Sequence, residues 1–343
     1  MNASESSPPT RATHARRGVV IILLAGFALA LYLVVHHGLV HILTTVRTLG
    51  WGIVAVVIAH LAQVMFSAAG WKAVSAPLAV VPLWVFVQAR LIREAVSALL
   101  PLTQIGGEVI ATRMMVLSGF KNGPAAGSVI VDLCIEILSQ ALFTIMGLAL
   151  LMMAGHRGPI VDLTLIGIVL LLSMAPALLL AQRRGLLRAL ERFFLKFAAR
   201  WPVLSSASLE GLHDAIQSAL SHPRALLRGF FAHLISWLIG GLEIWLMLHF
   251  MGALISPQEA LVIESLSQVV RSAAFAVPGA LGVQEGGFIL LGALYGLAPP
   301  MALAVSLVKR VREIILGVPG LWLWQRAENR RGWQTKIKSE MKA

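Results

Sequence analysis

Charged residues are scarce in this chain. Asp, Glu, Lys and Arg make up 13% of its 343 residues, whereas soluble domains carry roughly a quarter. Hydrophobic residues reach 58%, and the mean hydropathy is +0.82. A soluble core cannot absorb so much apolar surface. The composition therefore excludes an ordinary soluble domain and predicts an all-α polytopic membrane protein.

Reactive motifs are also missing. The single cysteine, Cys134, lies in an apolar stretch, so neither a disulfide framework nor a Cys-based metal site is expected. The HExxH, GxxxxGK[ST] and GxSxG patterns do not occur. We therefore predict no metal ion, no cofactor and no catalytic residue of these classes.

Long apolar runs are what the sequence has in abundance. A membrane-spanning helix needs about 20 apolar residues, and six runs meet or approach this length. They cover residues 18–36, 51–70, 125–153, 160–180, 226–250 and 302–324. Two further apolar regions, 82–120 and 256–298, are interrupted by proline and glycine. We interpret each as a re-entrant hairpin that enters and leaves the membrane on one side.

Basic residues are distributed unevenly under this arrangement. If residues 1–17 form a cytoplasmic tail, nearly all Lys and Arg outside the spans fall in that tail, in a loop at 181–225 and in a tail at 325–343. Only Arg47 and Arg157 fall in external segments. The positive-inside rule thus predicts a multi-pass protein of the bacterial inner membrane with both termini cytoplasmic.

The same distribution accounts for the net charge of +12 without nucleic acid as a partner. The loop at 181–225 mixes Leu, Phe and Trp with Arg and Lys, which is typical of helices on an anionic membrane surface. An ordinary solvated loop is the alternative. Expected partners are membrane lipids and the anionic cytoplasmic leaflet, with a second copy of the chain or lipid-biosynthesis enzymes as candidate protein partners.

The sequence also contains an internal repeat. When the chain is aligned with itself so that Pro101 falls on Pro278, Glu108 falls on Glu285, and further pairs match without a gap. This alignment also superposes expected spans that cross the membrane in opposite directions. We therefore predict an inverted repeat with halves at 18–154 and 160–324, an architecture of transporters whose site lies between the halves.

Polar residues within the membrane gather around the two hairpin turns. Irregular backbone at this depth requires protein or a water-filled cavity around it, so the turns indicate a cavity; kinked helices or external loops are the alternative. Buried charges mark functional sites in membrane proteins. The candidate substrate-binding or gating residues are Arg93, Glu94, Pro101, Gly106, Gly107, Glu108, Asp132, Glu136, Arg271, Pro278, Gly279, Gly282, Glu285, Lys309, Arg312 and Glu313.

Helical spacing places Asp132 and Glu136 on one acidic face, and Lys309, Arg312 and Glu313 on a mainly basic face. One interpretation is an ion-pair network between these two helices, and the other is a substrate role. Arginine suits an anionic group because its guanidinium binds phosphate through two hydrogen bonds; Arg93, Arg271 and Arg312 are the candidates. Arg90 and Arg113 are expected to extend to the membrane interface instead.

The hairpin motifs resemble a known family. Leu-Leu-Pro followed by Gly-Gly-Glu at 99–108, and Pro-Gly-x-Leu-Gly-Val-x-Glu at 278–285, are similar to motifs in the membrane region of lysylphosphatidylglycerol synthases. This flippase-like family includes members associated with hopanoid biosynthesis. The resemblance covers residues 18–325, and Ala280 stands where a second glycine is expected. It implies movement of a lipid or lipid-linked group between leaflets. Only residues 325–343 follow the last expected span, so aminoacylation is not expected.

Three function classes follow. The first is a flippase for an amphipathic lipid with an anionic head or an isoprenoid chain. The second is a membrane-embedded lipid-modifying enzyme that uses Glu108, Glu285 or Asp132 as acid or base. The third is a scaffold for lipid-biosynthesis enzymes. The broken hairpins and the resemblance favour the flippase.

Overall fold

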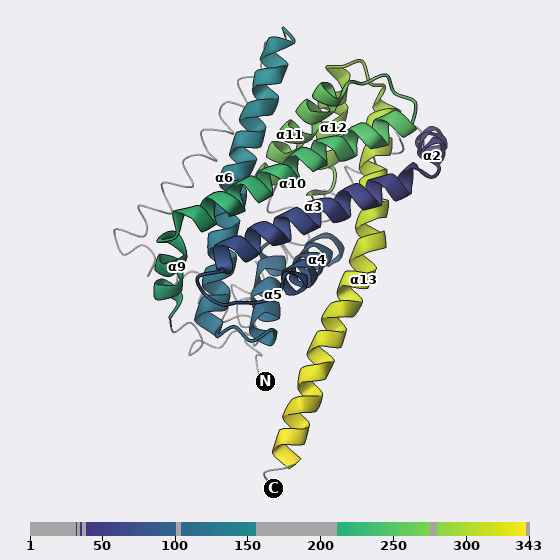
Figure 1. Ribbon diagram of the computed structural model, residues 1–343. Helices are drawn as coiled ribbons and strands as arrows, with labels where there is room; N and C mark the ends of the chain where they lie inside the picture. The colour runs from purple at the N-terminus through teal and green to yellow at the C-terminus, as the bar shows by residue number, and fades with distance from the viewer. Residues whose placement is uncertain are drawn as a thin grey trace, which may run out of the picture.

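The chain is an all-α membrane protein (Figure 1). The computed structural model describes Tyr32, Val35 and residues 39–100, 104–155, 211–274 and 280–340. Within these residues the helices are α2 (Leu39–Thr48), α3 (Gly52–Ser75), α4 (Leu83–Leu99), α5 (Gln104–Leu117), α6 (Asn122–Met153), α9 (Leu212–Leu220), α10 (Pro223–Phe250), α11 (Pro257–Ala273), α12 (Val283–Ala293) and α13 (Pro299–Glu340).

Local sequence signals explain several helix ends. α11 begins at a capping box, in which Ser256 accepts from the Glu259 amide and the Glu259 carboxylate accepts from the Ser256 amide. α4 ends at Leu99, two residues before Pro101, because a residue that precedes proline is disfavoured in helical conformation. The first hairpin therefore breaks where its sequence predicts.

Three described helices, α3, α6 and α10, are long and apolar enough to cross a membrane. They correspond to the expected spans 51–70, 125–153 and 226–250. α13 contains the expected span 302–324 but continues as one helix to Glu340, beyond the expected start of the C-terminal tail. The expected spans at 18–36 and 160–180 lie wholly or mostly outside the described residues, as does most of the loop at 181–225.

α3 and α10 form an antiparallel pair across the centre of the molecule (Figure 1). Glycines allow the two backbones to approach closely. A Cβ on Gly52, at the start of α3, would lie 2.6 Å from Phe250 at the end of α10; a Cβ on Gly229, near the start of α10, would lie 2.6 Å from Val74. Small residues suit this role because membrane helices associate by close packing rather than by the hydrophobic effect.

Two helical hairpins contact this pair, through α4 on α3 and α11 on α10. α4 and α5 form the first hairpin, and α11 and α12 form the second. α4 packs against α13, which belongs to the second half of the chain, while α11 packs against α6, which belongs to the first. Each hairpin is thus held by the long helix of the other half.

Helix boundaries recur in the register of the sequence repeat, which places Pro101 on Pro278. α6 begins at Asn122 and α13 at the equivalent Pro299, while α5 ends at Leu117 and α12 at Ala293, next to the equivalent position. The turns between these helices share their hydrogen bonds as well. Phe120 N donates to Met115 O at 3.1 Å, and Leu297 N donates to Gly292 O at 3.0 Å.

Gly119 and Gly296 continue this correspondence, because both have positive φ, +105° and +72°. A left-handed glycine after the last helical residue is a common helix terminator. The two turns therefore end their helices by the same device.

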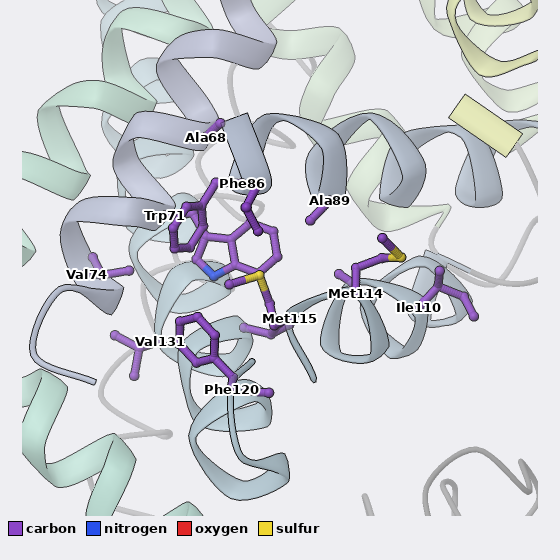
Figure 2. Packing of buried hydrophobic residues seen from close by; sticks show 14 of the residues in the cluster. Ala68, Trp71, Val74, Phe86, Ala89, Ile110, Met114, Met115, Phe120 and Val131 are labelled. Carbon is purple, nitrogen blue, oxygen red and sulfur yellow. The ribbon is translucent and has the colours of Figure 1, made fainter. Parts of the chain in front are cut away.

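Two apolar clusters surround the hairpins. The first-hairpin cluster joins α3, α4, α5 and the start of α6, with Trp71 packed edge-on to Phe86 at 5.4 Å and Phe86 edge-on to Phe120 at 6.5 Å (Figure 2). The second-hairpin cluster includes Ile244 of α10, Ile263 of α11 and Phe288 of α12. It also takes in residues near the C-terminal ends of α6 and α10. Edge-to-face rings are favourable packing geometries. Among the described residues, the buried apolar side chains thus form two clusters rather than one continuous core.

Gly107 holds the first hairpin closed. A Cβ at this position would lie 2.2 Å from Ser97 Oγ and 2.8 Å from the Arg93 carbonyl oxygen, both on α4. We expect Gly107→Ala to destabilise the folded protein by about 1–3 kcal/mol, the usual cost of overpacking. Unfolding of the detergent-solubilised protein would measure it. Gly286→Ala is the matched control, because a Cβ there meets nothing within 4 Å; equal stability of the two variants would contradict the prediction.

Candidate functional site: a charged cavity between the hairpins

A cavity of about 610 Å³ lies where both hairpins meet the central helix pair. Its wall combines apolar residues with an unusual concentration of charge. The charged lining residues are Arg90, Arg93, Glu94, Glu108, Glu136, Glu243, Glu264, Arg271, Lys309, Arg312 and Glu313, joined by His60 and His233. Charges inside a membrane protein are costly unless they are paired or hydrated. Their pairing therefore determines what the cavity can bind.

The first hairpin and α6 supply one ion-pair network. Arg93 Nη2 lies 2.7 Å from Glu108 Oε1 and 3.0 Å from Glu136 Oε2, so it ties α4 to both α5 and α6. Arg90 contacts both oxygens of Glu136, one of them at 3.0 Å. Two guanidinium groups therefore share one buried carboxylate, and they also lie within 4 Å of Glu94, Glu108 and Asp132.

The second hairpin and α13 supply another network. Lys309 Nζ lies 2.7 Å from Glu264 Oε2, and Gln268 donates to the other oxygen of Glu264 at 2.6 Å. Arg310 Nη1 lies 3.1 Å from Glu313 Oε2. Arg271 approaches Glu313 only to 3.6 Å, and its side chain is 27% exposed. Arg271 is therefore the least constrained of the cavity cations.

The central helix pair connects these networks. His60 on α3 lies between two carboxylates, with Nε2 at 3.1 Å from Glu94 Oε2 and Nδ1 at 3.2 Å from Glu243 Oε2. Glu243, on α10, also accepts from Gln63 and pairs with Arg312. A continuous chain of hydrogen bonds and ion pairs thus runs from the first hairpin through α3 and α10 to α13.

A second histidine of the cavity wall has different partners. His233 Nε2 contacts Asp132 Oδ1 at 2.9 Å, and its Nδ1 contacts the Ser67 hydroxyl at 3.1 Å. All three side chains are almost fully buried. The serine hydroxyl is both donor and acceptor, so this histidine can satisfy both ring nitrogens in its neutral form.

Gly282 and Glu285, at the start of α12, lie outside the cavity wall. Glu285 caps the helix by accepting from the Gly282 amide at 2.7 Å, and its other oxygen accepts from Ser306 on α13 at 3.0 Å. Arg310 approaches the same carboxylate to 3.5 Å. Glu285 therefore anchors the turn to α13.

Comparison with protein families matches residues 18–320 to the model described as lysylphosphatidylglycerol synthase TM region. The chain belongs to this family. The match confirms the resemblance that the hairpin motifs carry, and it identifies a membrane protein of lipid metabolism or transport. Comparison with curated proteins and with solved structures gave no significant match. The hopanoid-associated subgroup stays a prediction.

The structure gathers half of the sequence-predicted residues of this family member around one cavity. Eight of them line the cavity: Arg93, Glu94, Glu108, Glu136, Arg271, Lys309, Arg312 and Glu313. Asp132 lies behind the wall, and Gly106 and Gly107 are buried in the first hairpin. Gly282 and Glu285 form the cap of α12. Pro101, Pro278 and Gly279 lie outside the described residues.

Two expectations about individual charges were wrong. Arg90 does not extend to the interface; it is 8% exposed and pairs with Glu136 inside the protein.

The acidic face of α6 does not pair with the basic face of α13 either. Asp132 and Glu136 contact arginines of α4, while Lys309 and Arg312 contact Glu264 and Glu243. The reason is that each long helix packs against other helices of both halves, which supply nearer partners.

Arg113 also has a partner on the long C-terminal helix. It makes a bidentate pair with Glu328 of α13, with both distances at 2.9 Å. This pair lies outside the cavity wall. It joins the first hairpin to the portion of α13 that was expected to be a cytoplasmic tail.

Four polar residues of the site lie within apolar runs that were interpreted only as spans: His60, Gln63, His233 and Glu243. A sufficient signal was present, because an ionisable residue in the middle of such a run indicates a functional or paired group. Glu243 is the clearest case, with apolar neighbours on both sides in the sequence and 1% exposure.

Ala280 explains why the family motif favours glycine at its position. Its φ is +49°, in the left-handed region, and it is fully buried. This conformation costs a residue with a Cβ roughly 1–2 kcal/mol. We expect Ala280→Gly to stabilise the protein by up to about 1 kcal/mol, because relief of this strain exceeds the added chain entropy of glycine. Unfolding of the purified protein would test the sign, and a loss of stability would contradict it.

Proposed function

We propose that this protein is a flippase that moves an amphipathic lipid between membrane leaflets, without enzymatic modification. The observation that carries the proposal is the charged cavity between two hairpins in a membrane protein of this family. A lipid head must be sheltered from hydrocarbon as it crosses, and a cavity lined by ion pairs offers such a polar environment. The cavity carboxylates have cationic partners, which favours binding and gating over acid-base chemistry.

The proposed architecture is an inverted repeat with two re-entrant hairpins. Three observations support it: the recurrence of helix ends in the register of the sequence repeat, the antiparallel pairing of α3 with α10, and the reciprocal packing of α4 on α13 and α11 on α6. A proposed two-fold axis in the membrane plane, which exchanges the two halves, accounts for all three observations. Alternating access by movement of one half against the other follows from this arrangement.

Lys121 and Ala298 provide a test of the inversion, because they are equivalent under the repeat and both are exposed. We expect a cysteine at position 121 to react with a membrane-impermeant maleimide only from the cytoplasmic side, and one at position 298 only from the outside. Intact and opened inner-membrane vesicles would be compared in a Cys134→Ser background. Labelling of both positions from the same side would contradict the inverted arrangement.

The proposed substrate has an anionic head, because Arg271 is the cavity cation with the weakest protein contact. A guanidinium that lacks a close carboxylate partner can bind phosphate through two hydrogen bonds. Gln140, Gln268 and Ser272 stand beside it on the wall and supply neutral polar groups. Lipids with an isoprenoid chain and a phosphate head meet the same requirement.

Reconstitution tests the function directly. Purified protein would be placed in vesicles of phosphatidylethanolamine, phosphatidylglycerol and cardiolipin that contain a trace of fluorescent phosphatidylglycerol. Dithionite quenching reports how fast the label passes between leaflets. We expect faster exchange than in protein-free vesicles. Isoprenyl phosphate would be tested in the same vesicles by an enzymatic exposure assay, and failure to accelerate either lipid would reject the proposal.

Analysis of lipids from a deletion strain would separate transport from enzymatic action. Unchanged lipid composition with altered leaflet placement supports transport. Loss of a lipid species would favour a lipid-modifying enzyme instead. In the cell, the proposed location is the bacterial inner membrane with both termini cytoplasmic, as the basic segments indicate.

A further inference from the structure

We propose that His60 carries a proton that couples lipid movement to the proton gradient. This inference rests on the proposed flippase function and extends it to the energy source. Hydrogen-bond donors and acceptors do not balance around His60. Both of its ring nitrogens face carboxylate oxygens, at 3.1 and 3.2 Å.

A neutral imidazole has one N–H donor and one acceptor nitrogen, whereas an ionised carboxylate only accepts. His60 can therefore satisfy both Glu94 and Glu243 only if its two nitrogens each bear a proton, or if one carboxylate is protonated. Both carboxylates have arginine partners: Arg90 contacts Glu94 at 3.2 Å, and Arg312 contacts Glu243. An adjacent guanidinium favours the ionised carboxylate. The additional proton is accordingly placed on His60.

The other charged groups around His60 agree with this assignment. α4 presents Glu94 and Arg90, α10 presents Glu243, and α13 presents Arg312 and Lys309. Glu264 of α11 and Glu136 of α6 stand further along the same cavity wall. Five cations and six carboxylates line the cavity, and Asp132 behind the wall adds a further carboxylate. A proton on His60 reduces this excess of negative charge.

His233 provides a comparison within the same molecule. Its partners are Asp132 and the Ser67 hydroxyl, so a neutral ring satisfies both contacts. Both histidines border the cavity, but the His233 side chain is 1% exposed, whereas the His60 side chain is 14% exposed. Of these two histidines, His60 is the one that needs a second proton, and it is the more accessible to cavity water.

Proton release would change the connection between the two halves. The imidazolium gives one N–H proton to cavity water and becomes neutral imidazole. It can then donate to Glu94 on α4 or to Glu243 on α10, but not to both. The bridge that His60 forms between Glu94 of the first hairpin and Glu243 of the second half is then broken at one end. Protonation thus favours the state in which hairpin and central pair are joined, and deprotonation favours their separation, which is the coupling that a proton-driven carrier requires.

Nitrogen NMR of the full-length, ¹⁵N-histidine-labelled protein in lipid bilayers tests the proton directly. At about pH 8, above the ordinary histidine pKa of roughly 6.5, we expect an imidazolium signal that is absent from His60→Gln and present in His233→Gln. Glu94→Gln is a second, milder variant. Its amide can donate to the ring, so the His60 signal is expected to become that of a neutral tautomer. Neutral histidines alone in the native protein would overturn the inference, whether or not the protein moves lipid.

Vesicle transport tests the coupling. We expect exchange of fluorescent phosphatidylglycerol to become directional under a roughly tenfold proton gradient (about one pH unit) and to lose this directionality with a protonophore. Exchange that ignores the proton gradient, or that follows a sodium gradient instead, would overturn the coupling and leave the flippase function standing. An imidazolium signal without exchange of any lipid tested would reject the flippase function and, with it, the coupling.

Discussion

Replacing Glu243 by alanine is expected to destabilise the protein by about 3–5 kcal/mol, the largest stability effect we predict. The carboxylate is 1% exposed and accepts hydrogen bonds from Gln63 and His60 while it pairs with Arg312. Its removal leaves the Arg312 guanidinium buried without its principal partner, and breaking a buried ion pair by deleting one member is costly for this reason. Unfolding of the purified protein in detergent or bicelles would measure the loss.

Two comparisons make this prediction specific. Glu328→Ala removes the carboxylate of a part-exposed pair, where screening by solvent reduces the expected loss to about 1 kcal/mol or less. The double variant Glu243→Ala with Arg312→Leu is expected to recover part of the stability, because it removes the uncompensated charge along with the pair. A Glu243→Ala variant as stable as Glu328→Ala would contradict the ion-pair chain described above.

Replacing Arg271 by glutamine is expected to slow lipid exchange by roughly tenfold to a hundredfold, the largest functional effect we predict. That range corresponds to the loss of one charge-assisted contact to the lipid phosphate, worth about 1.5–3 kcal/mol. Stability should change little, because Arg271 approaches its nearest carboxylate, on Glu313, only to 3.6 Å and is partly exposed. The reconstituted exchange assay with fluorescent phosphatidylglycerol gives the rate.

Arg113→Gln is the matched control for charge. It also removes an arginine near a hairpin, but this residue pairs with Glu328 outside the cavity. Exchange at the native rate is therefore expected. If Arg113→Gln and Arg271→Gln slowed exchange equally, the effect would come from general loss of positive charge, and the proposed role of Arg271 would be rejected.

Several features were accessible from the sequence because they depend on local patterns. Scarcity of charge and long apolar runs predicted a helical membrane protein, since any segment in hydrocarbon must satisfy its own backbone hydrogen bonds. The proline at position 101 predicted an interruption of the first hairpin region, and α4 ends at Leu99. The internal repeat anticipated equivalent starts for α6 and α13 that no single motif defines.

Partner choice among the buried charges was not accessible in this way. Helical spacing placed Asp132 and Glu136 on one face, but it could not show that α4, rather than α13, packs against that face. The same limit applies to the contact between His60 and Glu243, which are 183 residues apart in sequence and meet because α3 and α10 pack together.

The sequence by itself thus determined the fold class, the family, the repeat and most of the charged residues that line the cavity. These depend on composition and on short-range periodicity, which each segment carries independently of its neighbours. Only the tertiary structure decided which charges neutralise one another, left Arg271 as the least constrained cation, and placed His60 between two carboxylates. Electrostatic interactions depend on distances of a few ångströms between separate helices, and those distances are set when the two halves pack together.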